Sequence, residues 1–361
     1  MYIKQPFCLI CVYNAIVPAI TEDICAQMIK IFVQEKETEY SKKFFIKLME
    51  MESNMTVSLD ILEIQGFDIS PEFTYPLFFL LLFFYFTLLF SNIGVLILII
   101  TEKSLHQPMY ILFCNLSVND LIGNTVLLPR LMAHIISTER FITYNQCAVQ
   151  AFYSHTFGSA SHMILIIMAI DRYVAICHPL RYSSIMTTKT VMWLSATAWG
   201  VSLLLVSVLI GLTVRLSRCR SVIQNAYCDN ASLFKLSCDN VSINNIYGLF
   251  FTVLLFSCSI GGIAVTYFRI ALNCWIKKNK ELNSKALQTC ASHLVLYLIM
   301  LWSGFLTIIL HRFPDYPDLR KIAYILFHVV PANLNPLIYG MQTRSLRDKI
   351  FQILKRKVTA N

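Results

Sequence analysis

Charged residues are scarce in this chain. Asp, Glu, Lys and Arg make up 14% of its 361 residues, whereas 56% are hydrophobic. A surface that faces water needs more charge than this, which nearly excludes a soluble enzyme. Glycine and proline are also few, at 11 each, and this excludes a collagen-like or low-complexity polymer. Together with a mean hydropathy of +0.60, the composition indicates a membrane protein.

The basic residues do not gather into one strongly charged segment. The net charge is +9, but Lys and Arg lie in short clusters between apolar runs. In a membrane protein, such clusters determine which loops stay in the cytoplasm. We therefore expect the lipid bilayer to be a partner of this chain and expect no nucleic acid.

Seven segments are long enough to cross a membrane, because a helix needs about 20 apolar residues to span ~30 Å of hydrocarbon. Most of them contain no Asp, Glu, Lys or Arg, namely residues 73–101, 141–170, 190–214, 240–268, 286–311 and 322–343. Residues 108–136 are equally apolar but carry Asp120 and Arg130. We predict an all-α membrane protein, a seven-transmembrane helix bundle over residues 73–343.

The distribution of Lys and Arg predicts the orientation of the bundle. The connections on the side of the carboxyl end carry more of these residues than the connections on the other side. Because positively charged loops stay inside, we expect residues 51–72 to be extracellular and residues 344–361 to be cytoplasmic, in the plasma membrane. Leu346 and Ile350 share one face among basic residues, which predicts a short amphipathic cytoplasmic helix after the seventh span.

Residues 1–50 fit no part of this scheme. Their apolar run, residues 7–20, is too short to span a bilayer. Three interpretations remain open: a signal peptide, an upstream extension of a gene model whose natural start is Met51, and a genuine additional segment.

Cysteine positions agree with the predicted orientation, because disulfides persist on the oxidising side of a membrane. Four of the 12 cysteines fall on the predicted outer side, namely Cys147, Cys219, Cys228 and Cys238. Four cysteines allow three different sets of disulfide pairings. The same side carries glycosylation sequons that begin at Asn54, Asn230 and Asn240. We predict modification at Asn54. The other cysteines show no metal-binding spacing, and no metal or cofactor is predicted.

A polar motif marks the inner end of the third span. Residues 168–182 read MAIDRYVAICHPLRY, in which Asp171 and Arg172 can form an ion pair at the membrane boundary. If the Asp-Arg-Tyr sequence were isolated, an ion pair that only anchors the helix would be the better interpretation. It is accompanied here by further polar motifs.

Two other spans contain polar residues that must find partners inside the bundle. In the seventh span, Pro336 frees a backbone carbonyl and Asn335 adds an amide group. In the second span, Asp120 lies near the middle of the membrane. We predict that Asp120 faces Asn335 and Asn92 of the first span, as the centre of a buried polar cluster.

Together these motifs resemble the rhodopsin-like G protein-coupled receptors, and among them the olfactory receptors. The similarity runs from about residue 51 to the carboxyl end, and its most specific segments are residues 105–110 (LHQPMY), 168–182, 285–294 (KALQTCASHL) and 336–340 (PLIYG). Residues 311–313 (HRF) resemble the fish-like class I branch, which is associated with water-soluble odorants. Residues 300–304 (MLWSG) depart from the family, which usually has a tyrosine there.

The resemblance implies a receptor that binds a small odorant and activates a stimulatory, olfactory-type heterotrimeric G protein. It also implies disulfides Cys147–Cys228 and Cys219–Cys238. Activation and G protein coupling are assigned by the same resemblance to Asp120, Asp171, Arg172, Tyr173, Tyr267, Asn335, Pro336 and Tyr339.

A ligand site in a helix bundle is expected in its outer half, under the second extracellular loop. Helical spacing places small and polar residues on one stripe of the third span, from Ser154 to His162. The predicted ligand-binding residues are His155, Gly158, Ser159, Thr252, Phe305, Ile308, Arg312 and Ile325. For each apolar member taken singly, packing against a neighbouring helix is the better interpretation. Arg312 with His155 is hypothesised to select acidic odorants, and the alternative is that Arg312 faces solvent or Asp315.

Three other functions compete with an odorant receptor. A rhodopsin-like receptor for another ligand would share the motifs of the third and seventh spans, but residues 285–294 argue against it. A transporter or channel could use Asp120 and the membrane histidines as an ion path, although no inverted repeat supports this. An enzyme is the weakest alternative, because the sequence has no HExxH motif and no Ser, His and acid set.

Overall fold

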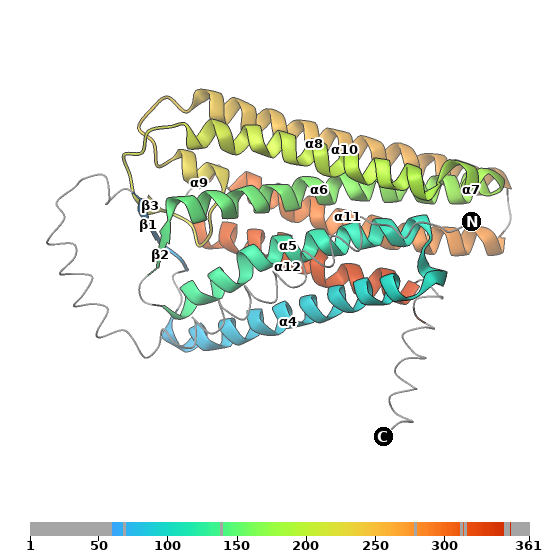
Figure 1. The fold of residues 1–361 in the computed structure, drawn as a ribbon, viewed down its shortest axis with the longest axis horizontal. Coiled ribbons are helices and arrows are strands. Elements are labelled where there is room, and N and C mark those ends of the chain that lie inside the picture. Colours follow the sequence, from blue (N-terminus) through green and yellow to red (C-terminus); the bar gives the residue numbers. More distant parts are fainter. Residues whose placement is uncertain are drawn as a thin grey trace, which may run out of the picture.

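The computed structural model describes residues 60–67, 70–137, 140–277, 280–310, 313, 316–342 and 347. In these residues 7 helices are long and apolar enough to cross a membrane. They are α4 (Pro71–Thr101), α5 (Pro108–Ile136), α6 (Tyr144–Cys177), α8 (Thr188–Val214), α10 (Ser242–Lys277), α11 (Lys280–Leu310) and α12 (Pro317–Gln342). They lie side by side along the long axis of the molecule (Figure 1), which confirms the predicted seven-helix fold.

Several predictions fall on other parts of the chain. Residues 1–50, Asn54 and Arg312 lie outside the described residues, as does the predicted amphipathic helix apart from Arg347. The boundaries predicted for the domains therefore stay predictions.

Helix α6 begins and ends at other residues than the charge-free segment 141–170 that predicted it. Helix α6 begins at Tyr144, because Thr143 caps it by accepting a hydrogen bond from the backbone N–H of Gln146. The three residues before it, predicted as helix, form a strand instead. At the other end, α6 continues past Asp171 to Cys177, since a helix can extend into the polar interface after its apolar part ends.

Helix α6 is the central element of the bundle. It packs against α5, α8, α10 and α11, whereas α4 contacts mainly α5 and α12. Most of the large side chains that α4 leaves exposed are aromatic, including Phe79, Phe83 and Phe90. A helix between lipid and bundle is expected to show such an apolar outer face. Short helices complete the loops, namely η1 (Lys103–Leu105), η2 (Pro179–Arg181), α7 (Tyr182–Ile185) and α9 (Asn230–Phe234).

A small sheet closes one end of the bundle, which we call the sheet end. Strand β1 (Ile61–Ile64) lies in the middle, antiparallel to β2 (Phe141–Thr143) and parallel to β3 (Val222–Ile223). Its side chains alternate, with Leu62 and Ile64 buried and Ile61 exposed. The sheet joins the segment before α4 to the loops before α6 and before α10 (Figure 1).

Both disulfides lie at the sheet end. Cys147, at the start of α6, is joined to Cys228, and Cys219 is joined to Cys238 within the loop between α8 and α10. Both pairings are those that the family resemblance implied. Cys147 and Cys228 are fully buried in one apolar cluster with the inward side chains of β1. The sheet and the first disulfide therefore hold the loop against the bundle together.

Gly66, just after β1, should not tolerate a side chain. Its φ of 68° lies in the left-handed region, and an added Cβ would contact the Arg140 guanidinium. We predict that Gly66→Ala lowers the free energy of unfolding by about 1–2 kcal/mol from the backbone conformation alone. The thermal unfolding midpoint of the purified protein in detergent measures this.

Gly94→Ala is the matched control. Gly94 lies inside α4, and no described atom lies within 4 Å of its added Cβ, so alanine should be neutral or slightly stabilising there. Equal midpoints for the two variants would contradict the role assigned to Gly66.

Candidate functional site

A cavity of about 440 Å³ lies inside the bundle near the sheet end. Helices α6, α10, α11 and α12 form its walls, and the short helix α9 of the second loop covers it. Pockets for small molecules commonly enclose about 300–1,000 Å³. The space therefore fits a small organic molecule rather than a folded partner.

The stripe predicted on α6 forms one wall of this cavity. Ser154, His155, Gly158, Ser159 and His162 all border it. Their spacing of three and four residues places them on one face of the helix. At Gly158 the missing side chain leaves room, because a Cβ there would lie 3.2 Å from a ring carbon of Phe327 on α12.

The other predicted residues are placed less uniformly. Thr252 of α10 and Ile308 of α11 border the cavity, whereas Phe305 does not and instead stacks on Phe256 with ring centres 4.5 Å apart. On α12, Ile325 does not border the cavity. Tyr324 and Phe327 border it instead, and ligand binding by Ile325 stays a prediction that the outline of the cavity does not support. The buried residues of α12, which include Ala323, Tyr324 and His328, recur with a helical period, but the period does not tell which of them border the cavity and which pack against another helix.

Sequence reasoning also missed the residues that the second loop contributes. Asp229, Asn230 and Phe234 border the cavity from α9 and its start. The Asp229 carboxylate caps this helix by accepting from the N–H of Ser232 at 2.8 Å. A helix of five residues gives no recognisable hydrophobic period, although the Asp-Asn-Ala-Ser sequence is a capping signal that could have located its start.

His155 supports the cover of the cavity. Its Nε2 accepts a hydrogen bond of 3.2 Å from the backbone N–H of Asn230. The Asn230 side chain is buried and accepts a 2.6 Å hydrogen bond from Thr213 on α8. The sequon at Asn230 is therefore not accessible to a glycan in this fold.

Polar side chains of α6 and α12 form hydrogen bonds with each other beside the cavity. The Ser154 hydroxyl contacts the phenol of Tyr324 and lies 3.0 Å from Nε2 of His328. Nδ1 of His328 is 3.0 Å from the Tyr324 carbonyl. Tyr324 also stacks on Tyr227 of the second loop, with ring centres 3.5 Å apart. These contacts tie α12 to both α6 and the loop.

His162 lies at the inner end of the α6 stripe and is 1% exposed. In the part of the chain that the structure describes, neither ring nitrogen has a hydrogen-bond partner. Phe256 of α10 and Tyr297 of α11 meet the imidazole edge to face, at 5.3 and 6.0 Å between ring centres. The Tyr297 hydroxyl donates to Ser259 instead, at 3.0 Å.

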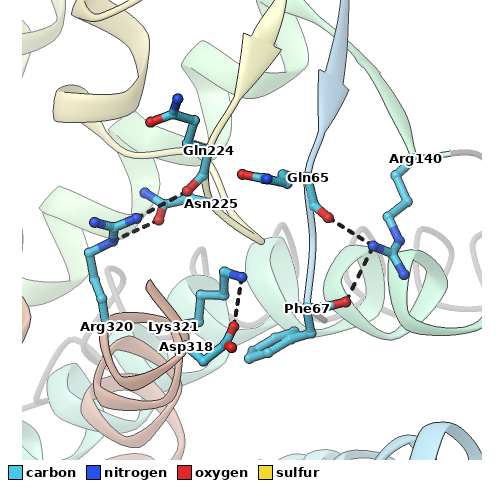
Figure 2. A network of polar contacts seen from close by, with 8 residues as sticks. All are labelled: Gln65, Phe67, Arg140, Gln224, Asn225, Asp318, Arg320 and Lys321. Carbon is cyan, nitrogen blue, oxygen red and sulfur yellow. Dashed lines mark hydrogen bonds and ion pairs between the residues drawn. The ribbon is translucent and has the colours of Figure 1, made fainter. Parts of the chain in front are cut away.

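Buried basic residues attach the sheet to the helices (Figure 2). Arg320 of α12 donates to the side-chain oxygen of Asn225 at 2.8 Å and to the carbonyl of Gln224 at 3.0 Å. Arg140 donates to the carbonyl of Gln65 at 2.8 Å. Figure 2 shows Lys321 pairing with Asp318 beside the ring of Phe67. Arg320 and Lys321 are almost fully buried.

The predicted polar cluster forms in the middle of the bundle, with one difference. The amide of Asn335 donates to the Asp120 carboxylate at 2.8 Å. Asn92 does not reach Asp120 and donates instead to the carbonyl of Ala332, at 3.0 Å. That carbonyl lies four residues before Pro336, whose ring nitrogen has no hydrogen to offer it. Asn92 therefore satisfies the backbone group that the proline leaves free.

At the end opposite the sheet, Asp171 and Arg172 form an ion pair. The phenol of Tyr182, in the loop after α6, donates to the other oxygen of Asp171 at 2.8 Å. Burial, together with the neighbouring Asp171 carboxylate, raises the pKa of the Tyr182 phenol, so the phenol keeps its proton and remains a donor.

The remaining residues that the family resemblance assigned to activation lie nearby. Tyr267 of α10 contacts Nδ1 of His293 on α11, and the rings of His293 and Tyr339 lie 6.4 Å apart. Tyr173 packs beside Tyr267 against the apolar cluster of α10 and α11. The structure brings together the residues predicted to couple helix movements at this end.

Comparisons with known proteins agree with these features. A family model described as olfactory receptor matches residues 81–357. Human olfactory receptor 52N4 is 33% identical over 268 residues, which cover 73% of this chain and 84% of the relative. Human olfactory receptor 5B12 is 34% identical over 302 residues, or 82% of this chain and 95% of the relative.

A solved structure shows the same fold. The crystal structure of squid rhodopsin superposes with a TM-score of 0.63 and 20% sequence identity, covering 81% of this chain and 89% of that chain. The helix bundle is thus the rhodopsin-like arrangement.

Arg320 is expected to hold the cover of the cavity in place. Because Arg320→Ala leaves Asn225 and a loop carbonyl without their charged donor, we predict a loss of about 2 kcal/mol in the free energy of unfolding. Thermal unfolding of the purified protein tests this. Arg220→Ala, at an exposed arginine of the same loop, is the control and should change the free energy by less than about 0.5 kcal/mol. Equal effects would refute the role of Arg320.

Proposed function

Because this chain belongs to the olfactory receptor family, whose members are membrane-spanning, G protein-coupled signalling receptors rather than enzymes, we propose that it is activated by a small, water-soluble odorant and signals through a stimulatory, olfactory-type G protein. The observation that carries the proposal is the covered cavity of about 440 Å³, which small and polar residues of α6 line on one side and a mixture of apolar and polar residues of α10 lines on another. This combination of apolar lining and few polar groups is typical of sites for small ligands.

The proposed mechanism is a shift between two packings of the same bundle. His162 borders the cavity and contacts Tyr297 of α11. On the same helix, one turn away, His293 contacts Tyr267. A ligand that displaces α11 at the cavity thereby also acts on the end opposite the sheet.

At that end, the Asp171–Arg172 pair is the contact that must open. Arg172, released from Asp171, and the repacked Tyr267 and Tyr339 would border a groove for the G protein. The pair is a plausible latch because a guanidinium stays charged at every physiological pH.

The hypothesis of an acidic odorant depends on Arg312 and His155. Arg312 lies outside the described residues, and His155 accepts the Asn230 amide, so His155 supports the cover whether or not it meets ligand. Recognition of an acidic odorant by Arg312 with His155 stays a prediction, as does membership of the class I branch.

A cyclic AMP assay tests the proposed function. Cells that express the chain from Met51 are exposed to small acids, amino acids, amines, alcohols and aldehydes. We expect a saturable response to at least one class. Arg172→Ala should abolish that response at equal surface expression, because the variant lacks the guanidinium that is proposed to border the G protein groove once it is released from Asp171.

A response that survives in Arg172→Ala would contradict the proposed coupling. Silence across the panel, with confirmed surface expression, would favour a different G protein or a rhodopsin-like receptor for a small ligand outside olfaction.

The proposed orientation places the sheet end outside the cell. Both disulfides lie at that end, and disulfides form on the oxidising side. Asn240, beside α10, is exposed, and its side-chain oxygen accepts from the N–H of Ser242. Its amide nitrogen, the atom that carries a glycan, is not needed for that bond.

We predict that glycosidase treatment increases the electrophoretic mobility of the wild-type chain. Asn54→Gln and Asn240→Gln should each reduce this shift, and the double variant should abolish it, because both sequons would face the secretory lumen. Absence of the shift, together with an amino-terminal tag that antibodies reach only after permeabilisation, would reverse the orientation.

A further inference from the structure

The inner end of the cavity holds a polar side chain that the fold itself does not use. His162 is 1% exposed and borders the cavity, yet neither Nδ1 nor Nε2 has a hydrogen-bond partner among the described residues. A buried polar group without a partner costs about 1–3 kcal/mol. Such a group in a folded protein therefore requires an explanation.

The polar groups around His162 are already engaged with one another. The Tyr297 hydroxyl donates to Ser259, and the Ser259 hydroxyl donates to the Phe256 carbonyl at 3.2 Å. Ser159, on the same face of α6, donates to the Thr156 carbonyl at 3.3 Å. The hydroxyl groups around His162 thus have partners of their own, while His162 borders the cavity with neither ring nitrogen bonded to a described residue.

Charge is placed at the other end of the cavity. Among the described lining residues the charged ones are Asp229 and Lys235, and both belong to the cover formed by α9 and its flanks. The carboxylate of Asp229 also caps that helix. Around His162 the lining is aromatic, with Phe256 stacked on Phe305. A carboxylate or an ammonium group at this depth would find no described partner of opposite charge, and its desolvation would be costly.

We propose that His162 is the hydrogen-bonding anchor of the ligand, and that the ligand is a neutral molecule with a hydroxyl or carbonyl oxygen at its deeply inserted end. A neutral imidazole presents one donor and one acceptor. A hydroxyl group can use both, and a carbonyl oxygen can accept from the N–H. The apolar remainder of the molecule then lies against Phe251, Leu255 and Ile308. This inference rests on the proposed function, since it names the chemical class that the same cavity selects.

The test uses the full-length receptor and a matched set of probes: hexanol, hexanal, hexanoic acid, hexylamine and hexane. Cyclic AMP dose responses are measured for wild type, His162→Phe and His162→Gln at equal surface expression. We expect hexanol or hexanal to activate the wild type. His162→Phe keeps an aromatic ring but removes the hydrogen bond, and should raise the half-maximal concentration about tenfold, as loss of ~1.4 kcal/mol requires. His162→Gln keeps a donor and an acceptor and should restore part of the sensitivity.

His134→Phe is the matched control. His134 is a buried histidine of α5 whose Nδ1 also has no described partner, but it does not border the cavity. Its substitution should leave the half-maximal concentration unchanged. Equal sensitivity of wild type and His162→Phe, or activation by hexanoic acid alone that His162→Phe does not alter, would overturn the proposal.

A second measurement, which needs no agonist, tests whether the fold itself uses the His162 imidazole. In the purified, ligand-free receptor, His162→Phe should leave the thermal unfolding midpoint unchanged or raise it, because the substitution removes an unsatisfied polar group. A lower midpoint would show that a structural partner, such as a buried water, uses the imidazole, and would overturn the anchor. If no probe activates the wild type, the proposed function fails for these ligands, and the midpoint alone decides the role of His162.

Discussion

Hydrocarbon offers no hydrogen-bond partner, so the backbone polar groups of the bundle must find their partners within the protein. Helix α12 shows how a carbonyl that a proline leaves free is satisfied. Pro336 deprives the Ala332 carbonyl of its helical donor, and Asn92 supplies one from α4. Next to that proline, Asn335 reaches across to Asp120 of α5. Two hydrogen bonds thus connect α4, α5 and α12 in the middle of the bundle.

The same constraint explains why so much of the fold could be predicted. Uninterrupted apolar segments must be helices in a membrane, so six of the seven spans follow from the absence of charge, and the second follows from its length and apolar character despite Asp120 and Arg130. On α6 the helical period places His155, Gly158 and His162 on one face, because small and polar residues there contrast with apolar neighbours. The resemblance to olfactory receptors added both disulfide pairings.

Other parts of the site could not be predicted, for equally physical reasons. Strands of four, three and two residues carry no recognisable alternation, and β1 finds its partners in loops far away along the chain. On α12 the helical period distinguishes a buried side, but tertiary packing decides that Tyr324 rather than Ile325 borders the cavity. The hydrogen bonds of Arg320 could not be predicted either, because its partners lie in a loop whose course depends on the sheet.

The contacts that close the sheet end have a consequence for how such receptors diversify. Arg140 binds the main-chain oxygen of Gln65, and Arg320 binds that of Gln224. Strand β1 likewise pairs through its backbone. Main-chain groups are the same whatever side chain a residue carries. Many positions at the sheet end can therefore be substituted without breaking the contacts that hold the cover of the cavity in place. Residues that line the cavity can then be substituted one at a time, and each substitution can alter which ligand the cavity selects while the fold stays stable.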